Sequence, residues 1–342
     1  MKKYILLFAT LLTTLTAMAQ EEKDTVIITL QNGTEVRYTS DQFDRVQIIY
    51  NLHYGVKVYL KDGKSKDYLA KEVRVAEYQG GSQVVTDNNK NRNRYRAKLL
   101  EYPHLAADST MNQLIIKSTA AYGITYSLEW SYKDKANRWT CYQMHSGNNM
   151  KNVTRSNDPW TTDTEIPTQY RTYKSDFTNN QDISKGHLCP SQDRLCSKDQ
   201  NEQTFFMSNI QPQWQKHNGG IWLTFENLIR PWSQKYDTLY VVKAATITPD
   251  KVYDFKLNDK LLMPKYFYMA LLQYDKDTNK YEAMALWTVH EDKSISKADF
   301  KDYAITIDEL EELTGIDFFC NLPDDIEDDV EKVLHLDAWK LE

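Results

Sequence analysis

The first 80 residues alternate between apolar and polar positions in short runs that are separated by glycine turns. Residues 29–33 read TLQNG and residues 59–63 read YLKDG, 30 positions later. Asn-Gly or Asp-Gly between two alternating runs is the strongest short-range signal for a β-hairpin. Tyr38 and Tyr68 match at the same offset. The pattern therefore predicts a small all-β module with two hairpin-like repeats over residues 20–80.

From about residue 100 the pattern becomes that of an α+β domain. Strands are predicted at residues 126–130 and 238–242, and helices at residues 218–232, at residues 306–313 and after Pro323. Thr306 is followed three positions later by Glu309, which is the spacing of a capping box at a helix start. We predict one α+β domain over residues 100–342.

The first 19 residues have the pattern of a cleaved secretory signal peptide. Lys2 and Lys3 precede an apolar run at residues 4–15, and residues 17–19 (AMA) place small side chains where a signal peptidase accepts them. The apolar run is shorter than the ~20 residues that a transmembrane helix needs. We therefore expect a secreted or periplasmic protein with no stable membrane insertion.

Charge is unevenly distributed along the chain, whose formal net charge is −6. Residues 299–342 hold 15 acidic residues against three lysines, a net of −12, and the leader holds +2, so residues 20–298 carry +4. A nucleic-acid partner is therefore not excluded. Residues 81–99 are polar, rich in Asn and Arg and without apolar periodicity, which predicts a linker. Contact of their basic side chains with a polyanion is the alternative interpretation.

Four cysteines follow the leader, at Cys141, Cys189, Cys196 and Cys320. An exported protein can form disulfides, and four cysteines allow three complete pairings. Four buried free thiols are the other possibility. Spacing alone does not decide between them.

The densest group of chemically reactive residue types lies between residues 182 and 230. His187 follows a glycine, and Glu226 stands eight positions after Asn218. Residues eight apart on a regular helix share a face, so Asn218 and Glu226 are predicted to face one site. An amide oxygen and a carboxylate suit a hard cation such as Mg²⁺, which keeps several waters and few protein ligands.

This segment resembles the DNA/RNA non-specific endonuclease family of the ββα-metal class. The family signature is a DRGH strand, then SNxxPQ, then an asparagine and a glutamate on the next helix. The chain has SKGH at residues 184–187 and SNIQPQ at residues 208–213. The resemblance spans about residues 110–342, with ANRW at residues 136–139 and LTGIDFF at residues 313–319. It implies a ββα-metal nuclease fold with a central antiparallel sheet, preceded by the small all-β domain.

The resemblance also implies a metal-dependent endonuclease that hydrolyses DNA and RNA without sequence specificity and leaves 5′-phosphates. The implied cofactor is Mg²⁺, with Mn²⁺ as a substitute. The implied roles are general base for His187, direct metal ligand for Asn218, an outer metal contact for Glu226, positioning of the histidine or the phosphate for Asn209, and substrate phosphate contacts for Lys185 and Arg230.

Two residues depart from the family signature. Ser184 and Lys185 stand where the family has Asp and Arg, so a planar guanidinium fork is replaced by the point charge of an ammonium. An alternative function is therefore a catalytically impaired nuclease fold that binds polyanions or a partner at the cell surface. A phosphodiesterase acting on small diesters is a third possibility. His217, beside Asn218, is interpreted as a structural neighbour and not as a second ligand.

Overall fold

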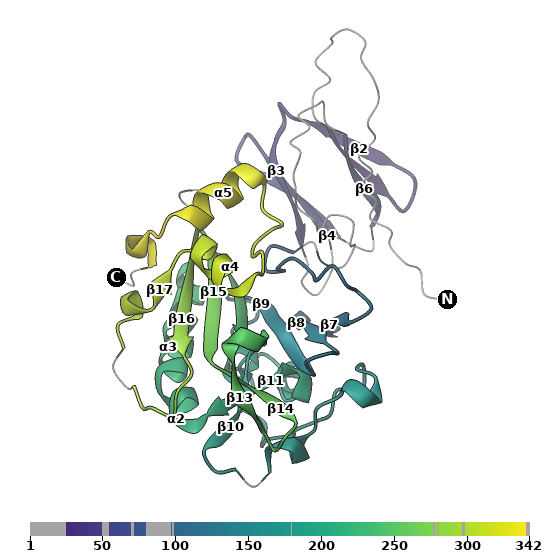
Figure 1. Ribbon diagram of the computed structural model, residues 1–342. Coiled ribbons are helices and arrows are strands. Elements are labelled where there is room, and N and C mark those ends of the chain that lie inside the picture. Colours follow the sequence, from purple (N-terminus) through teal and green to yellow (C-terminus); the bar gives the residue numbers. More distant parts are fainter. Residues whose placement is uncertain are drawn as a thin grey trace. The chain divides into compact units, whose positions relative to one another are not determined.

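The computed structural model describes residues 25–49, 55–69, 72–79, 97, 99–178, 180–275, 278, 280–295 and 298–339. The predicted signal peptide and nearly all of the predicted linker lie outside these residues. The chain divides into two compact units, residues 1–86 and 87–342 (Figure 1). Each unit is considered by itself.

The N-terminal unit contains two three-stranded antiparallel sheets. Their strand orders are β2-β1-β6, from β2 (Glu35–Thr39), β1 (Thr25–Leu30) and β6 (Val73–Gln79), and β3-β4-β5, from β3 (Phe43–Ile49), β4 (Gly55–Leu60) and β5 (Ser65–Leu69). Both predicted hairpins are present, β1–β2 and β4–β5. Their turns hold Gly33 at φ +86° and Gly63 at φ +82°, a region that glycine enters without the steric cost of a Cβ.

The sequence repeat corresponds to an exchange of strands between the two hairpins. β3, which follows the first hairpin, pairs with the second, and β6, which follows the second, pairs with the first. Tyr38 and Tyr68 meet with their hydroxyl oxygens 2.5 Å apart and their rings edge to face. Ile28 and Val58, at equivalent places in β1 and β4, are fully buried in one shared core.

A seven-stranded antiparallel sheet forms the centre of the second unit (Figure 1). Its order is β17-β16-β15-β12-β9-β8-β7, with bounds β7 (Asn112–Thr119), β8 (Gly123–Ser131), β9 (Ala136–Met144), β12 (Thr238–Ala245), β15 (Tyr266–Asp275), β16 (Lys280–Val289) and β17 (Ala304–Ile305). The predicted strands at residues 126–130 and 238–242 lie within β8 and β12. The predicted central antiparallel sheet is confirmed.

Both faces of this sheet are buried. Successive side chains of a strand point to opposite faces, so each strand contributes residues to two cores. In β9, Tyr142 belongs to the core on one face and Trp139 to the core on the other. The first core also contains Phe225 and Trp232 of a helix, and the second contains Leu310 from the C-terminal region. The sheet is therefore the rigid platform on which the other elements are fixed.

The remaining elements surround the sheet. The strands are β10 (Ile183–His187), β11 (Ile210–Trp214), β13 (Val252–Leu257) and β14 (Leu261–Pro264), and the helices are α1 (Lys198–Gln203), α2 (Gln215–His217), α3 (Leu223–Lys235), α4 (Ile307–Thr314), α5 (Asp324–Lys332) and the π-helical η5 (Asn218–Trp222). Short 3₁₀ turns lie at η1 (Thr168–Tyr170), η2 (Lys174–Phe177), η3 (Ser191–Arg194), η4 (Met207–Asn209), η6 (Pro249–Lys251), η7 (Phe300–Asp302) and η8 (Leu336–Trp339).

The C-terminal helices begin where the sequence predicts. At the start of α4, the Thr306 hydroxyl accepts a hydrogen bond from the Glu309 N–H at 3.1 Å, and the Glu309 carboxylate accepts one from the Thr306 N–H at 2.9 Å. This is the predicted capping box. The second predicted helix, α5, begins directly after Pro323.

The prediction of one continuous helix over residues 218–232 is wrong. Residues 218–222 form a π-helical turn in which Gly220 has φ −107° and ψ −110°, values outside any regular helix. The regular helix α3 begins only at Leu223 and continues to Lys235 through Pro231. The break at Gly220 cannot be recognised from the sequence, because the apolar positions on either side of it keep the helical spacing.

All four cysteines are buried, and none of them forms a disulfide in the structure. Within the residues that the structure describes, no helix is long and apolar enough to cross a lipid bilayer.

Candidate active site

The two-stranded sheet of β10 and β11 carries the SKGH segment beside the SNIQPQ segment. In its register Gly186 lies opposite Gln211, and His187 lies opposite Ile210. A Cβ atom at Gly186 would collide with the Gln213 side chain and lie 3.1 Å from the Gln211 carbonyl oxygen. The glycine before the histidine is therefore required by the close approach of the two strands.

The His187 side chain is half-buried between two aromatic rings. Its ring centre lies 5.2 Å from that of Trp160 and 5.1 Å from that of Phe205. Burial, reinforced by the nearby positive charge of Arg155, lowers the pKa of His187 to about 3. Its Nε2 is buried and has no hydrogen-bond partner in the described part of the chain. The imidazole is thus neutral at neutral pH, and its Nε2 is available to a partner other than the described residues.

Lys185 lies on the same face of β10 as His187, because residues two apart in a strand share a face. Its ammonium nitrogen is 5.4 Å from the ring centre of Trp160 and 5.7 Å from that of Phe177. Both are cation–π contacts. Trp160 therefore contacts both side chains. Ser184, on the other face, donates a hydrogen bond to the Gln215 side chain.

Asn209 uses its whole amide group on the backbone. Its Oδ1 accepts a hydrogen bond from the Cys189 N–H at 2.9 Å, and its Nδ2 donates to the carbonyl oxygens of Cys189 and Thr204, each at 2.9 Å. The Asn209 carbonyl also accepts from the Leu188 N–H at 3.0 Å. The contacts of Asn209 therefore hold the two residues that directly follow His187.

Asn218 begins the π-helical turn, and Glu226 lies in the first turn of α3. Asn218 is half-buried, and its side chain makes no hydrogen bond to any described residue. Glu226 is 9% exposed, and its carboxylate lies 3.7 Å from the Lys243 ammonium. Burial outweighs this neighbouring cation and raises the pKa of Glu226. The spacing of eight residues places Asn218 and Glu226 on one face only if the helix between them is regular. Gly220 interrupts that helix, so the spacing no longer supports a shared face.

Arg230 binds protein groups with all of its guanidinium nitrogens. Nε donates to Asp193 at 2.7 Å, Nη1 to Asn227 at 2.6 Å and Nη2 to Glu226 at 3.4 Å. Asp193 is fully buried and also accepts a hydrogen bond from the Tyr142 hydroxyl at 3.0 Å. Arg230 thus links Glu226 to a buried acid. Its predicted role as a phosphate fork stays a prediction.

His217 is buried in the core beside the site. Its Nδ1 is 2.8 Å from the Gln213 amide nitrogen, and its Nε2 is 3.0 Å from the Thr288 hydroxyl. Burial lowers its pKa to about 3. Because both ring nitrogens have protein partners, this geometry supports the interpretation of His217 as a structural neighbour.

Three residues of the site have no signal in the sequence pattern: Arg155, Trp160 and Asp193. Arg155 donates to the Ser191 hydroxyl at 2.9 Å, forms an ion pair with Asp158 at 2.8 Å and stacks on the Phe205 ring. Arg155 and Trp160 come from a long segment between β9 and β10 that has no periodicity. Only the folded chain brings them to His187.

The comparisons with known proteins identify the family and the fold of the chain. Residues 106–325 match the DNA/RNA non-specific endonuclease family, so the chain belongs to this family. It has the ββα-metal nuclease fold, and it is a nuclease, a hydrolase acting on DNA and RNA. Members of this class use a divalent metal ion.

Individual relatives are distant. A protein named Nuclease from Nostoc sp. is 26% identical over 226 residues, which cover 64% of this chain and 78% of that protein. Human mitochondrial nuclease EXOG is 21% identical over 225 residues, 63% of this chain and 60% of that protein. One chain in the solved structure of the EndoG/EndoGI complex superposes with a TM-score of 0.56 at 17% identity, over 68% of this chain and 93% of that chain.

The residues present fit a divalent cation of this class. Among the residues that the structure describes, neither the Asn218 amide nor the buried Nε2 of His187 has a hydrogen-bond partner. Amide and carboxylate oxygens are ligands that suit a hard cation, which keeps most of its waters. Asn218 would hold the ion directly, with Glu226 as an outer contact.

Proposed function

We propose that this chain is an exported endonuclease that hydrolyses phosphodiester bonds of DNA and RNA without sequence specificity, with His187 as general base and Mg²⁺ at Asn218. The observation that carries the proposal is the neutral, buried and unpartnered Nε2 of His187. A nitrogen in this state accepts a proton from an attacking water, and proton transfer by a positioned imidazole contributes about 10²–10⁴-fold to a rate.

The low pKa of the free histidine fits this role once substrate is considered. A pKa of about 3 keeps His187 deprotonated but makes it a weak base. The negative charge of a bound phosphate raises the pKa of a neighbouring imidazole and opposes the effect of Arg155. Substrate binding therefore makes His187 a stronger base for the step in which it takes a proton from the attacking water.

The metal supplies Lewis-acid chemistry when bound: it polarises the phosphate and neutralises the charge that develops on the leaving 3′ oxygen. Asn218 would hold the ion, and Mn²⁺ is expected to replace Mg²⁺. Arg230 and Lys243 form ion pairs with the carboxylate of Glu226, which would be the outer contact of the ion. The expected products carry 5′-phosphates.

Substrate contacts are proposed for Lys185 and Arg230, as the family signature implies. Both groups recognise phosphate and not base edges, so the enzyme is expected to ignore sequence. Asn209 is proposed as a positioning residue, because its amide fixes the backbone after His187.

Export is proposed from residues 1–19 alone, with Lys2 and Lys3 before a short apolar run and AMA at the cleavage site. N-terminal sequencing of the protein recovered outside the cytoplasm tests it. A new N-terminus at Gln20 is expected, and an intact Met1 would contradict it.

A second candidate function is polyanion binding without hydrolysis. Two observations favour it: Lys185 lacks the guanidinium fork of the family, and Arg230 is bound to three protein side chains. In this interpretation the site keeps its positive charge and binds the polyanion, but it no longer catalyses hydrolysis.

The test compares supercoiled plasmid DNA and an RNA transcript, each with Mg²⁺ and with EDTA. We expect degradation of both substrates with Mg²⁺ only, and loss of activity in Asn218→Ala. Asn112→Ala, which replaces an asparagine on β7, is the matched control and stays active. Retarded migration of uncut DNA in a gel, with no cleavage in any metal, would instead establish the binding function.

A further inference from the structure

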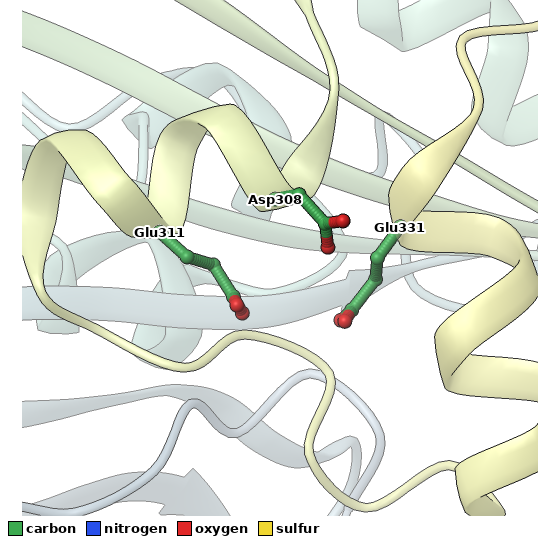
Figure 2. Close-up of side chains that lie close together, drawn as sticks. All are labelled: Asp308, Glu311 and Glu331. Atoms are coloured by element: carbon green, nitrogen blue, oxygen red, sulfur yellow. The ribbon is translucent and has the colours of Figure 1, made fainter.

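Three carboxylates converge between α4 and α5 in the C-terminal region. They belong to Asp308 and Glu311 of α4 and to Glu331 of α5, and Figure 2 shows all three pointing into the same space. One oxygen of each lies within 4.8 Å of the oxygens of the other two. We call this group the three-carboxylate cluster. None of its members belongs to the site around His187.

A second observation, at Glu331, indicates that the cluster lacks a positively charged partner among the described residues. The residue is only 6% exposed, and its Oε1 is buried without a hydrogen-bond partner. Among the residues that the structure describes, no lysine, arginine or histidine forms an ion pair with Asp308, Glu311 or Glu331. A buried and unpaired carboxylate is costly, and buried charges are ordinarily paired or coordinate a metal.

The two α4 carboxylates are held in place by their surroundings. Glu311 accepts a hydrogen bond from the Phe318 N–H at 2.6 Å through Oε1, which orients its second oxygen. Asp308 lies in the first turn of α4, between the two residues of the capping box. Ile307 and Leu310 are fully buried and fix this helix on the sheet. The Glu311 carboxylate and the helix that carries Asp308 are therefore held in place.

We propose that the three-carboxylate cluster binds one Ca²⁺ ion. Oxygen ligands surround Ca²⁺ at about 2.3–2.6 Å, so two ligands on opposite sides of the ion are up to ~5 Å apart. The cluster oxygens lie within 4.8 Å of one another, which is compatible with this shell. The shell of Mg²⁺, at about 2.0–2.1 Å, is smaller, and Mg²⁺ dehydrates reluctantly. Asp308 and Glu311 are half-buried, which leaves room for waters to complete the coordination.

The electrostatic field around the cluster favours a cation. Six of the nine residues of α5 are acidic, and its one lysine, Lys332, is paired with Asp328 at 3.2 Å. Glu331 also lies beyond residue 325, where the match to the nuclease family ends. Asp308 and Glu311 lie within the matched residues, so only Glu331 adds to the cluster from outside the match. A bound ion would link α5 to α4 and so to the central sheet.

The test measures thermal unfolding and calorimetric binding of Ca²⁺ alone to the full chain after removal of metals by a chelator. All proteins carry Asn218→Ala, so that the candidate catalytic site does not contribute. We expect Ca²⁺ to raise the unfolding temperature in a saturable way, with a stoichiometry of one. An equal concentration of Mg²⁺ is expected to give a smaller shift.

Glu331→Gln is the decisive variant, because it keeps the shape of the side chain and removes a buried charge, so folding is preserved. It should weaken Ca²⁺ binding at least about tenfold, which corresponds to ~1.4 kcal/mol. Asp329→Asn, on the exposed side of α5, is the matched control and should bind normally. The proposal is overturned by an absent Ca²⁺ shift, by an equal shift with Mg²⁺, or by full Ca²⁺ binding in Glu331→Gln.

Discussion

Single side chains set the chemistry of this site through what surrounds them. The rings of Trp160 and Phe205 enclose His187 and keep it neutral, and Trp160 also contacts the Lys185 ammonium. The position that departs from the family signature is thus coupled to the proposed base through one tryptophan. Changes at Lys185 and at Arg155 test this coupling from two directions.

Lys185→Arg is expected to raise kcat/KM on plasmid DNA by about tenfold. A guanidinium binds phosphate through two parallel hydrogen bonds, whereas an ammonium is a point charge, and a tenfold gain corresponds to ~1.4 kcal/mol. Initial rates of plasmid nicking measure it. Lys198→Arg, on the exposed face of α1, is the control and should leave the rate unchanged. A lower rate in Lys185→Arg would show that the ammonium is the better fit at this site.

Arg155→Gln is expected to move the acidic limb of the pH profile of kcat/KM to higher pH. Arg155 lowers the pKa of His187, so removing its charge raises that pKa. A general base loses activity as the pH falls through its pKa. If the pKa of His187 is higher, the activity is therefore lost at a higher pH. Arg37→Gln, in the N-terminal unit, is the control. An unchanged acidic limb in Arg155→Gln would contradict the assignment of His187 as the titrating base.

Close backbone approaches determine the shape of the elements that carry the site. Gly186 allows β10 to lie close against β11. Gly220 interrupts the helix after Asn218, and a Cβ atom added to it would lie within 3.3 Å of the Ile295 backbone. The capping box of α4 and the hairpin turns were predictable because a few neighbouring residues determine them. The π-helical turn was not, because the segment that packs on Gly220 lies far away in the sequence.

Gly186→Ala is expected to lower the free energy of unfolding by about 1–3 kcal/mol, since overpacking displaces the backbone. Urea denaturation with a fixed m value measures the loss. Gly219→Ala is the matched control, because an added Cβ there meets no atom nearer than 3.8 Å. Equal stability of Gly186→Ala and Gly219→Ala would show that β10 and β11 separate easily.

For the whole molecule, the sequence predicted the family, the central antiparallel sheet and the residues of the signature. It did not predict the contacts that support them, because these join distant segments. Arg230 reaches Asp193 across 37 positions, and His217 reaches Thr288 across 71. Local periodicity contains no information about such pairs. Only the fold shows that Arg230 is already bound to protein side chains.

The N-terminal unit is expected to be dispensable for hydrolysis. All the residues of the candidate site lie within residues 87–342, which form their own compact unit with its own core. A chain limited to these residues should fold and degrade plasmid DNA with the kcat/KM of residues 20–342. Circular dichroism checks folding. A folded but inactive fragment would show that the β module takes part in catalysis or substrate binding.

The most direct test of the central claim is single-turnover cleavage of an end-labelled DNA by His187→Ala in the presence of Mg²⁺. The account predicts a rate loss of about 10²–10⁴-fold, with 5′-phosphate ends on the products of the parent enzyme. His335→Ala, an exposed histidine in the segment after α5, is the matched control and should cleave normally. Cleavage by His187→Ala at the parent rate would contradict the account.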